Sequence, residues 1–426
     1  MFKAVTVVGL GKIGLPLAAV FASNGLQVYG ADINNRVVNS VNRGESHVRN
    51  EPGLEELLKK TQKNGKLVAT TNTAEAVSKS DVVIVIVPLL IKDNNEINYS
   101  FIDSAVVDIG KGIKKGTLVI FETTLPTGDT RNRFGKKLEE ISGLSLGTDF
   151  FLAYSPERVY SNRIIEDLKN YPKVVGGLNE QSLKIASSFY QEALKCNLIK
   201  VSSLETAEFA KVAECVYRDV NIALANELAE FADKKNINML EVIKASNSQP
   251  FSNLHFPGIG VGGHCIPVYP YFFINNGLKN GIITLSREIN DNMSDYAIGK
   301  IESAIGSLKS KNVLILGLSF RENVKETTKS TTLLLINQLK IKQANIFLND
   351  PLFTHTEIKS YNVSPLSLDD EIISKIDVVI LQAFHNQYQS LDFNKFTSCK
   401  IVLDGRNSLN KKIINQLGIR YEGIGN

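Results

Sequence analysis

The sequence predicts an α/β protein with two Rossmann-like, doubly wound parallel-sheet domains, joined by a long central α-helix with an all-α middle region. Short β-branched runs alternate with helical patterns in both the first and the last third of the chain, as in βαβ units. Between them, Ser203 to about Lys235 has the pattern of one continuous helix. We expect an N-terminal Rossmann domain over residues 1–195, a central helical domain over 196–305, and a C-terminal Rossmann-like domain over 306–426.

Composition narrows the function classes. Of 426 residues, 43% are apolar and 22% charged, which is typical of soluble globular proteins, and the formal charge of +4 gives no support to a nucleic-acid or membrane partner. The apolar run from Ala4 to Ala22 is interrupted by Lys12 and by glycines, unlike a signal peptide, and no run reaches the ~18 apolar residues of a membrane span. The four widely spaced cysteines favour reduced thiols in a cytoplasmic protein and no metal site.

The N-terminus has the order of a dinucleotide-binding fingerprint. A strand over Ala4–Val8 precedes a glycine-rich turn and a helix, and a second strand over Gln27–Ala31 ends in Asp32. Asp32 would bind a ribose 2′-hydroxyl and repel a 2′-phosphate, which favours NAD over NADP; the alternative is a mere tight turn. The predicted cofactor contacts of this fingerprint are Gly9, Gly11, Lys12, Ile13, Gly14 and Asp32.

Three further strands end in polar, turn-forming residues. Asp81–Val87 ends at Pro88, Leu118–Phe121 runs into Glu122-Thr123-Thr124-Leu125-Pro126, and Phe150–Tyr154 runs into Ser155-Pro156-Glu157-Arg158. Because parallel strands end at one edge of a sheet, where α/β proteins bind ligands, Val87, Pro88 and Thr124 join the predicted cofactor site. Thr124 and Glu157 could handle a proton or orient a water; a helix cap and a solvated acid are the alternatives.

The long central helix predicts a spine between domains. At 1.5 Å per residue it would run roughly 45 Å, too long for a crossover helix. Lys211 lies within it, four positions before Cys215, and would be a solvated charge unless it faces a catalytic site. Small residues permit close helix contacts, so we expect a homodimer surface at Ala207, Ala210, Ala213, Ala223, Ala225 and Ala229.

A glycine-rich loop carries the most reactive candidate side chain. Four glycines occur within Gly258–Gly263, which excludes regular helix and lets a ligand approach bare backbone. The loop ends in His264-Cys265. One interpretation is a nucleophilic thiol beside an anion-binding loop, and the other is a connection with an inert cysteine.

The last third repeats the first in outline. Asn312–Leu318, Ile346–Asp350 and Lys375–Ile380 echo the N-terminal strands, but Ser319 stands where the fingerprint has Gly11. We therefore expect a doubly wound domain that binds a nucleotide of another kind, or none.

Together these motifs resemble the UDP-sugar 6-dehydrogenase family over nearly the whole chain. The glycine turn, the strand-end motifs and Lys211 are joined by three more markers: Gly262-Gly263-His264-Cys265, Gly317-Leu318-Ser319-Phe320-Arg321 and Asp404-Gly405-Arg406-Asn407. Gly-Gly-His-Cys and Tyr217-Arg218-Asp219-Val220-Asn221 look more like the branch that acts on UDP-N-acetylhexosamines, of manno or gluco configuration, than like the UDP-glucose branch.

The resemblance implies a four-electron, NAD-dependent oxidation of a sugar C6 hydroxyl to a uronic acid, for polysaccharide or glycan precursors. It implies that Lys211, with water held by Thr124 and Glu157, manages the proton, and that Cys265 forms a thiohemiacetal and then a thioester. It also implies a homodimer, and a C-terminal domain that holds the UDP. The implied substrate contacts are Glu157, Arg158, Val159, Lys211, Cys215, Gly258, Gly260, Gly262, Arg321 and Arg406.

The chain departs from the family pattern at four places. Tyr269 replaces an aspartate, Cys215 an asparagine, Leu89-Leu90 a Thr-Pro pair, and Thr328, next to Lys329, an arginine. Alternatives therefore stay open: a UDP-glucose 6-dehydrogenase, a two-electron NAD dehydrogenase of the hydroxy-acid or 6-phosphogluconate kind, and a non-catalytic nucleotide-sugar-binding protein.

Overall fold

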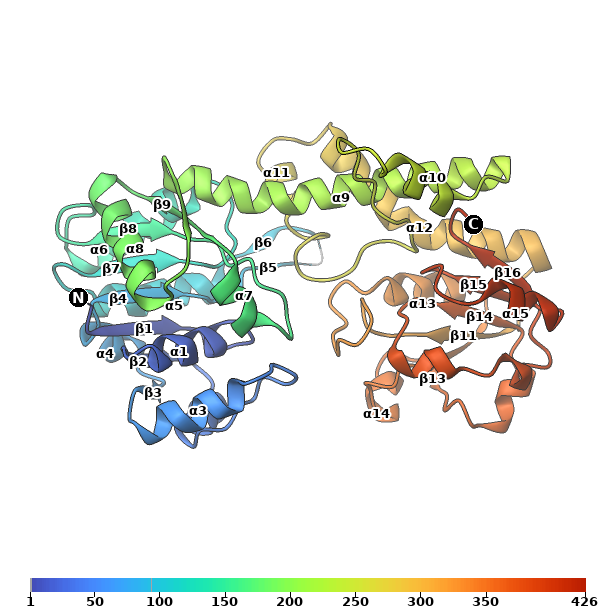
Figure 1. Cartoon of the computed structure of the whole chain (residues 1–426), viewed down its shortest axis with the longest axis horizontal. Coiled ribbons are helices and arrows are strands. Elements are labelled where there is room, and N and C mark those ends of the chain that lie inside the picture. Colours follow the sequence, from blue (N-terminus) through green and yellow to red (C-terminus); the bar gives the residue numbers. More distant parts are fainter. Residues whose placement is uncertain (1, 93) are drawn as a thin grey trace. The chain divides into compact units, whose positions relative to one another are not determined.

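The computed structural model describes residues 2–92 and 94–426 (Figure 1). The chain forms two compact units, residues 1–213 and 214–426, and the division falls inside the long helix α9. Each unit contains one large sheet flanked by helices, so the predicted α/β class with two Rossmann-like sheets is confirmed. The three-part domain division stays a prediction.

Unit 1 is built on an eight-stranded sheet of order β10-β9-β8-β7-β4-β1-β2-β3. All neighbouring strands are parallel except β8 and β9, which run antiparallel. The strands are β1 Ala4–Val8, β2 Gln27–Ala31, β3 Leu67–Thr70, β4 Val82–Val85, β7 Leu118–Phe121, β8 Phe151–Tyr154, β9 Lys173–Gly177 and β10 Leu198–Val201, with a separate hairpin of β5 Leu90–Ile91 and β6 Ile97–Asn98.

Helices cover both faces of this sheet (Figure 1). Side chains alternate along a strand, so Val5 and Val7 of β1 share one face, where they pack with Leu15 of α1, Leu58 of α3 and Phe189 of α8. On the other face α5 lies between α4 and α6. The helices of unit 1 are α1 Gly14–Ser23, α2 Asn35–Asn42, α3 Leu54–Lys63, α4 Thr73–Ser78, α5 Ser100–Gly112, the π-helical turn η1 Thr130–Gly135, α6 Lys136–Ser142, α7 Ile164–Asn170 and α8 Glu180–Ala193.

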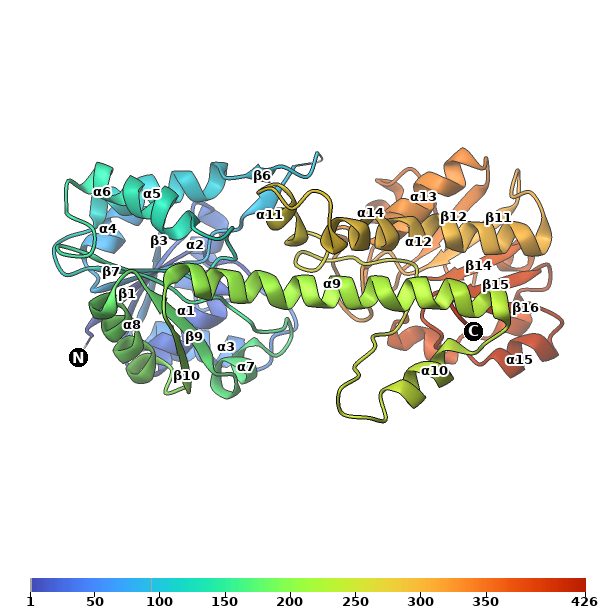
Figure 2. The same ribbon diagram turned by 90° about the horizontal axis from the view of Figure 1, so that it is seen from above.

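Helix α9 spans Leu204–Lys235 without interruption, which confirms the predicted long helix (Figure 2). Its start is capped by Ser203, whose Oγ accepts the N–H of Thr206 at 3.1 Å. The alanine surface predicted for a dimer is wrong for four of its six residues. The side chains of four of those alanines are buried within the chain itself: Ala207, Ala223, Ala225 and Ala229.

Unit 2 contains a six-stranded, fully parallel sheet of order β13-β12-β11-β14-β15-β16. The order β12-β11-β14 matches β2-β1-β4 of unit 1, so the predicted repeat is confirmed. The strands are β11 Asn312–Leu316, β12 Asn345–Asn349, β13 Ser364–Pro365, β14 Val378–Leu381, β15 Ile401–Asp404 and β16 Arg420–Gly423.

Alternation along β11 divides the core of unit 2 into two layers. Val313 and Ile315 pack with residues of α9, α12 and α13, whereas Leu314 and Leu316 pack with Ile414 of α15 on the other face. The helices of unit 2 are α10 Met239–Ser246, α11 Pro270–Ile274, α12 Ile282–Ile305, α13 Thr331–Ile341, α14 His355–Lys359 and α15 Lys411–Gln416, with 3₁₀ turns over Glu371–Lys375, Asn386–Ser390 and Phe393–Lys395.

Candidate active site

The glycine turn after β1 has the geometry that a dinucleotide requires. Gly9 has φ +95°, and a Cβ atom on Gly14 would overlap the carbonyl oxygen of Gly9, so both positions need glycine. A Cβ atom on Gly11 would meet no heavy atom within 4 Å, which leaves room for a phosphate. Ile13 is the N-cap of α1 and cannot cap it with its side chain. The N–H groups of Leu15 and Leu17 bond to Gly11 and Ile13 and Pro16 has none, which leaves the N–H of Gly14 for a ligand.

Asp32 lies directly beside this turn. One carboxylate oxygen accepts the N–H of Leu10 at 2.9 Å, and the other accepts the N–H of Asn34 at 2.9 Å. The carboxylate is thus oriented at the end of β2, where a ribose hydroxyl would lie in the fingerprint. The residues present fit NAD, and contacts of individual side chains with it stay predictions.

The ends of β4, β7 and β8 share one edge of the sheet, as predicted, because the three strands are parallel neighbours. After β4, the carbonyl oxygen of Val87 accepts the hydroxyl of Thr123 at 2.7 Å, while Pro88 is exposed. Thr124 is 7% exposed, and no partner of its hydroxyl is found among the described residues. At the Leu89-Leu90 departure, the chain enters the β5–β6 hairpin.

A buried cluster of charges joins the same strand ends. Lys173, the first residue of β9, donates to Glu122 at 2.9 Å and to Glu157 at 2.8 Å. Tyr190 of α8 donates its hydroxyl to the other oxygen of Glu122 at 2.5 Å. The interpretation of Glu157 as a solvated surface acid is therefore wrong. The predictions assigned no role to Lys173, Glu122 or Tyr190; the one available signal was a lysine placed directly before the apolar run Val174–Val175.

The two carboxyl groups of this cluster differ in pKa. Burial raises the pKa of Glu122 to about 7, against the opposing effect of Lys173. Burial acts in the same direction on Glu157, but Lys173 and the backbone N–H of Arg158 outweigh it, so its pKa lies below the usual range. The loop after β8 is tied to this group, because Glu157 Oε1 accepts the N–H of Arg158 at 2.6 Å and of Val159 at 3.2 Å. Arg158 itself donates to the carbonyl of Pro172 at 3.1 Å.

Lys211 is a buried cation in the first half of α9. Its side chain lies in unit 1, and the residue is only 8% exposed. Within residues 2–92 and 94–426, no hydrogen bond or ion pair of its ammonium group is found. The interpretation of Lys211 as a solvated surface charge is therefore wrong, and the amine is left available for a ligand.

The cysteine loop belongs to unit 2, and its glycines pack against the chain. A Cβ atom on Gly258 would lie 3.1 Å from the carbonyl oxygen of Gly405, and one on Gly260 would lie 2.8 Å from that of Asn290. A Cβ atom on Gly262 would lie 2.6 Å from the Cβ of Phe320. These close approaches give the glycines a packing reason, and their contact with a sugar stays a prediction.

Cys265 is partly exposed at the end of this loop. Its carbonyl oxygen accepts the N–H of Tyr269 at 2.9 Å, which places the tyrosine one turn after the thiol. At another departure, the carbonyl oxygen of Thr328 accepts the N–H of Gly263 at 2.8 Å, so this position supports the loop through its backbone. His264 pairs with Glu326 on the same supporting segment.

Cys215 differs from Cys265, because its side chain is fully buried. Arg218, one turn later on α9, donates to its sulfur at 3.3 Å. Cys265 is therefore the thiol of unit 2 that solvent and substrate can reach, whereas Cys215 and Cys399 are buried.

The second sheet replaces the dinucleotide fingerprint with an internal network. Asp350, at the position of Asp32, accepts the N–H groups of Leu318 and Ser319, the Ser319 hydroxyl, and a bond from His385 at 3.0 Å. All four bond to Oδ2, and Oδ1 accepts the N–H of Leu352 at 2.9 Å, so both oxygens have internal partners. The expectation that this domain binds nucleotides differently agrees with this geometry.

Two arginines follow the strands of the second sheet. Arg406 donates to the carbonyl oxygens of Gln382 at 2.5 Å and Phe320 at 3.2 Å, and burial lowers its pKa. The Nε of Arg321 is buried, and no partner for it is found in the part of the chain that the structure describes. Arg406 therefore fixes the backbone around it, and the binding of an anion by Arg321 stays a prediction.

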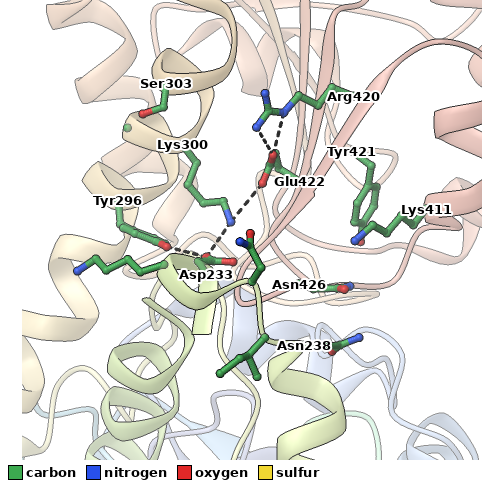
Figure 3. A pocket seen from close by; sticks show the side chains of 14 residues that line it. Asp233, Asn238, Tyr296, Lys300, Ser303, Lys411, Arg420, Tyr421, Glu422 and Asn426 are labelled. Carbon is green, nitrogen blue, oxygen red and sulfur yellow. Dashed lines mark hydrogen bonds and ion pairs between the residues drawn. The ribbon is translucent and has the colours of Figure 1, made fainter. Parts of the chain in front are cut away.

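A separate hollow of about 750 Å³ lies in unit 2 between the end of α9, α12 and β16 (Figure 3). Lys300 donates to Asp233 at 2.7 Å and to the carbonyl of Gly423 at 2.8 Å, and Arg420 pairs with Glu422 at 2.7 Å. These contacts join α9 and α12 to the C-terminal strand β16.

Neither a metal centre nor a membrane segment is found in the described residues. Outside residues 1 and 93, no group of three or more His, Cys, Asp or Glu side chains could hold a metal ion. None of the described helices is both long and apolar enough to cross a membrane.

The fold and these sites define a class of protein: an NAD-dependent dehydrogenase with a second parallel αβ sheet and a cysteine loop. Residues 3–194, 205–292 and 314–411 match, in order, the NAD binding domain, the central domain and the UDP binding domain of the UDP-glucose/GDP-mannose dehydrogenase family.

Individual proteins are similar over the same length. A UDP-N-acetyl-D-mannosamine dehydrogenase of Campylobacter jejuni is 35% identical, covering 93% of this chain and 99% of that protein. The structure of a UDP-D-ManNAc dehydrogenase from Pyrococcus horikoshii matches with a TM-score of 0.88 at 30% identity, covering 99% of each chain. That of an NDP-N-acetyl-D-galactosaminuronic acid dehydrogenase from Methanosarcina mazei Go1 has a TM-score of 0.87 at 28% identity, covering 100% and 95%. The chain belongs to the UDP-glucose/GDP-mannose dehydrogenase family and is an NAD-dependent oxidoreductase.

Proposed function

We propose that this enzyme oxidises the C6 hydroxyl of a UDP-N-acetylhexosamine, UDP-N-acetylmannosamine or UDP-N-acetylglucosamine, to the uronic acid. The observation that carries the proposal is that one chain has both a dinucleotide turn with an oriented Asp32 and a partly exposed thiol at Cys265. The turn serves hydride transfer, and the thiol serves an oxidation beyond the aldehyde. The names of the similar proteins support the N-acetylhexosamine class.

In the first oxidation the protein must bind the hydroxyl and remove its proton. Bound NAD supplies the hydride acceptor for both oxidations. Lys211 is suited to polarise the oxygen, because its buried ammonium group has no internal carboxylate partner among the described residues. Thr124 offers a free hydroxyl that can orient the water that carries the proton away. The first oxidation removes two electrons and leaves an aldehyde.

In the second oxidation Cys265 forms a covalent bond with the substrate. Its sulfur attacks the aldehyde carbon, and the carbonyl oxygen takes a proton to give a thiohemiacetal. Loss of hydride and a proton then gives a thioester, which brings the total to four electrons. Attack by water breaks the carbon–sulfur bond and releases the acid and the free thiol.

Two groups complete the proposed site. Glu157 orients the hydrolytic water and, through its bonds to the N–H groups of Arg158 and Val159, shapes the loop after β8. Arg321 binds the diphosphate of the UDP, while Arg406 holds the surrounding backbone.

The decisive experiment measures NADH per sugar. The protein is incubated with NAD and the UDP-linked N-acetyl derivatives of mannosamine, glucosamine and galactosamine, and with UDP-glucose. We expect two NADH per sugar with the N-acetylmannosamine or N-acetylglucosamine derivative. One NADH would indicate a two-electron dehydrogenase, and activity confined to UDP-glucose would indicate the other branch. Binding of a UDP-sugar without any NADH would indicate a non-catalytic homologue and end the proposal.

We also propose that the enzyme is a homodimer through α9. Tyr217, Leu224 and Phe231 follow one another at intervals of seven residues, so they share one face of the helix. They are 53%, 44% and 58% exposed in the single chain, which is unusual for three large apolar side chains in a row. A second copy of the same stripe would cover them.

The cytoplasm is the proposed location of the enzyme. All four cysteines are free, including the partly exposed Cys265, which is typical of a reducing compartment. Cell fractionation with detection of the protein tests this assignment, and recovery with an extracellular marker would contradict it.

A further inference from the structure

Glu208 of α9 is a fully buried carboxylate, and no ion pair of it with a lysine or arginine is found among the described residues. Its Oε2 accepts the N–H of Gly128 at 2.6 Å, and its Oε1 accepts the N–H of Thr130 at 2.9 Å. Both oxygens therefore bind the backbone of one segment that is about 80 residues away in sequence. This use of a buried charge demands a reason, because removing a carboxylate from water is costly.

The segment that Glu208 holds is itself unusual. Thr130 begins the π-helical turn η1, and π-helical turns are rare and often occur at functional sites. The positive end of the helix formed by η1 and α6 favours an anion at this place. Burial nevertheless raises the pKa of Glu208 to about 7, so the site holds its charge at a cost.

Each of the two segments that this contact joins also carries a proposed reacting group. Gly128 and Thr130 lie four and six residues after Thr124. On α9, Glu208 precedes Lys211 by three residues, so the two side chains lie one turn apart on the same side of the helix. All of these residues belong to unit 1.

We propose that Glu208 is a positioning residue, which fixes the loop that carries Thr124 to the helix that carries Lys211. This inference rests on the proposed function, because it assigns Thr124 and Lys211 to the proton transfer of the first oxidation. Two hydrogen bonds, which the carboxylate of Glu208 accepts from Gly128 and Thr130, set the distance between the Thr124 hydroxyl and the Lys211 amine before substrate binds. Loss of the carboxylate then affects the chemical step more than binding.

The same helix supplies a matched control. Glu205 lies one turn before Glu208 and also contacts the η1 segment, through Arg131 at 2.6 Å. That ion pair is about one-third exposed on both sides, 35% and 32%, and it joins two flexible side chains. Partly exposed ion pairs contribute little to stability. Glu205→Gln therefore removes a charge from the contact between α9 and η1 without loosening the backbone of η1.

The test compares full-length Glu208→Gln, Glu208→Asp and Glu205→Gln with the unaltered enzyme. Glu208→Gln keeps the size but offers an amide where two N–H groups need acceptors, and Glu208→Asp keeps the charge. We expect Glu208→Gln to lower kcat by about 10- to 100-fold. Its KM values for NAD and the active UDP-sugar should change less than about threefold, because binding is spared. Glu208→Asp should recover part of kcat, and Glu205→Gln should match the unaltered enzyme.

A readout without substrate separates this inference from the proposed function. Amide hydrogen exchange of peptides that cover residues 126–135 should accelerate in Glu208→Gln and stay unchanged in Glu205→Gln. If the unaltered enzyme forms no NADH, the proposed function fails. Unchanged exchange in Glu208→Gln would then also overturn the proposal that Glu208 fixes the 126–135 segment to α9. If the enzyme is active, an unchanged kcat in Glu208→Gln overturns the positioning role even where exchange accelerates. Should Glu208→Gln fail to fold, Glu208→Asp decides, since a normal kcat with faster exchange contradicts the proposal.

Discussion

Cys265 is the residue on which the extent of oxidation depends. A thiol can add to the aldehyde and later leave from a thioester, whereas a serine hydroxyl is a far weaker nucleophile at neutral pH. We therefore expect Cys265→Ser to stop after the first oxidation, so that NADH per sugar falls from two to at most one. Product analysis by mass spectrometry should show the aldehyde or its hydrate in place of the acid.

The control for this variant is the same substitution at Cys399. That thiol is buried in unit 2, donates to the carbonyl of Ile401 at 3.3 Å, and has a pKa that burial raises to about 12. A serine can keep the hydrogen bond, so Cys399→Ser should still give two NADH per sugar. Two NADH per sugar from Cys265→Ser would show that its thiol is not the nucleophile.

At the scale of elements, the ends of β7 and β8 place two carboxyl groups beside the lysine that begins β9. Glu122 has a pKa of about 7 in the folded protein against an ordinary value of 4.5, so folding takes up a proton between these values. Its contribution to stability is fully present below pH 4.5 and is lost as pH rises through 7. We expect the free energy of unfolding, relative to a Glu122→Gln variant, to fall by about 1.4 kcal/mol per pH unit across this window.

Urea unfolding at pH 5, 6 and 7, followed by circular dichroism, measures this slope. Glu357→Gln is the comparison, because its bonds with Lys325 and Thr354 lower the pKa of Glu357 to about 2 and its titration lies outside the window. The difference between the unaltered enzyme and Glu357→Gln should therefore stay constant from pH 5 to 7. Equal pH slopes in the unaltered enzyme and in Glu122→Gln would refute the raised pKa.

How far the sequence predicts such a site depends on whether its parts are adjacent along the chain. The turn from Gly9 to Gly14 and the acid at Asp32 follow one another within 24 residues, so their local pattern is sufficient. The pairing of Lys173 with Glu157 requires that β9 runs antiparallel to β8, which brings the start of one strand beside the end of the other. No local pattern around Lys173 specifies strand direction.

The sequence is equally limited in predicting which face of a helix is buried. The period of α9 and its length could be predicted, but which face the rest of the chain covers could not, because the covering segments lie far from α9 in the sequence. Ala229 packs in the core of unit 2, next to Gly425 near the end of the chain. Glu208 was missed for the same reason, since its partners precede it by about 80 residues.

At the scale of the whole molecule, two similar sheets have diverged in what their second strand offers to a ligand. β2 leads into Asp32, whose two oxygens accept one backbone N–H each, whereas β12 leads into Asp350, whose Oδ2 has four internal partners and whose Oδ1 accepts a backbone N–H. Gly14 allows close packing of α1 in the first sheet. In the second, Thr332 of α13 donates its hydroxyl to the carbonyl of Gly317 at 2.6 Å. One architecture thus supports a dinucleotide site in one unit and a differently built nucleotide site in the other.

The stripe on α9 gives the prediction that concerns the whole assembly. Leu224 lies at its centre, between Tyr217 and Phe231, and a charge there would be buried without a partner in a symmetric interface. We expect Leu224→Glu to shift the enzyme from dimer to monomer in sedimentation velocity experiments at micromolar concentration. Ile413→Glu is the control, because Ile413 is a similarly exposed apolar residue (53%) on α15, away from the stripe. A dimer that persists in Leu224→Glu, or that dissociates equally in Ile413→Glu, would place the interface elsewhere.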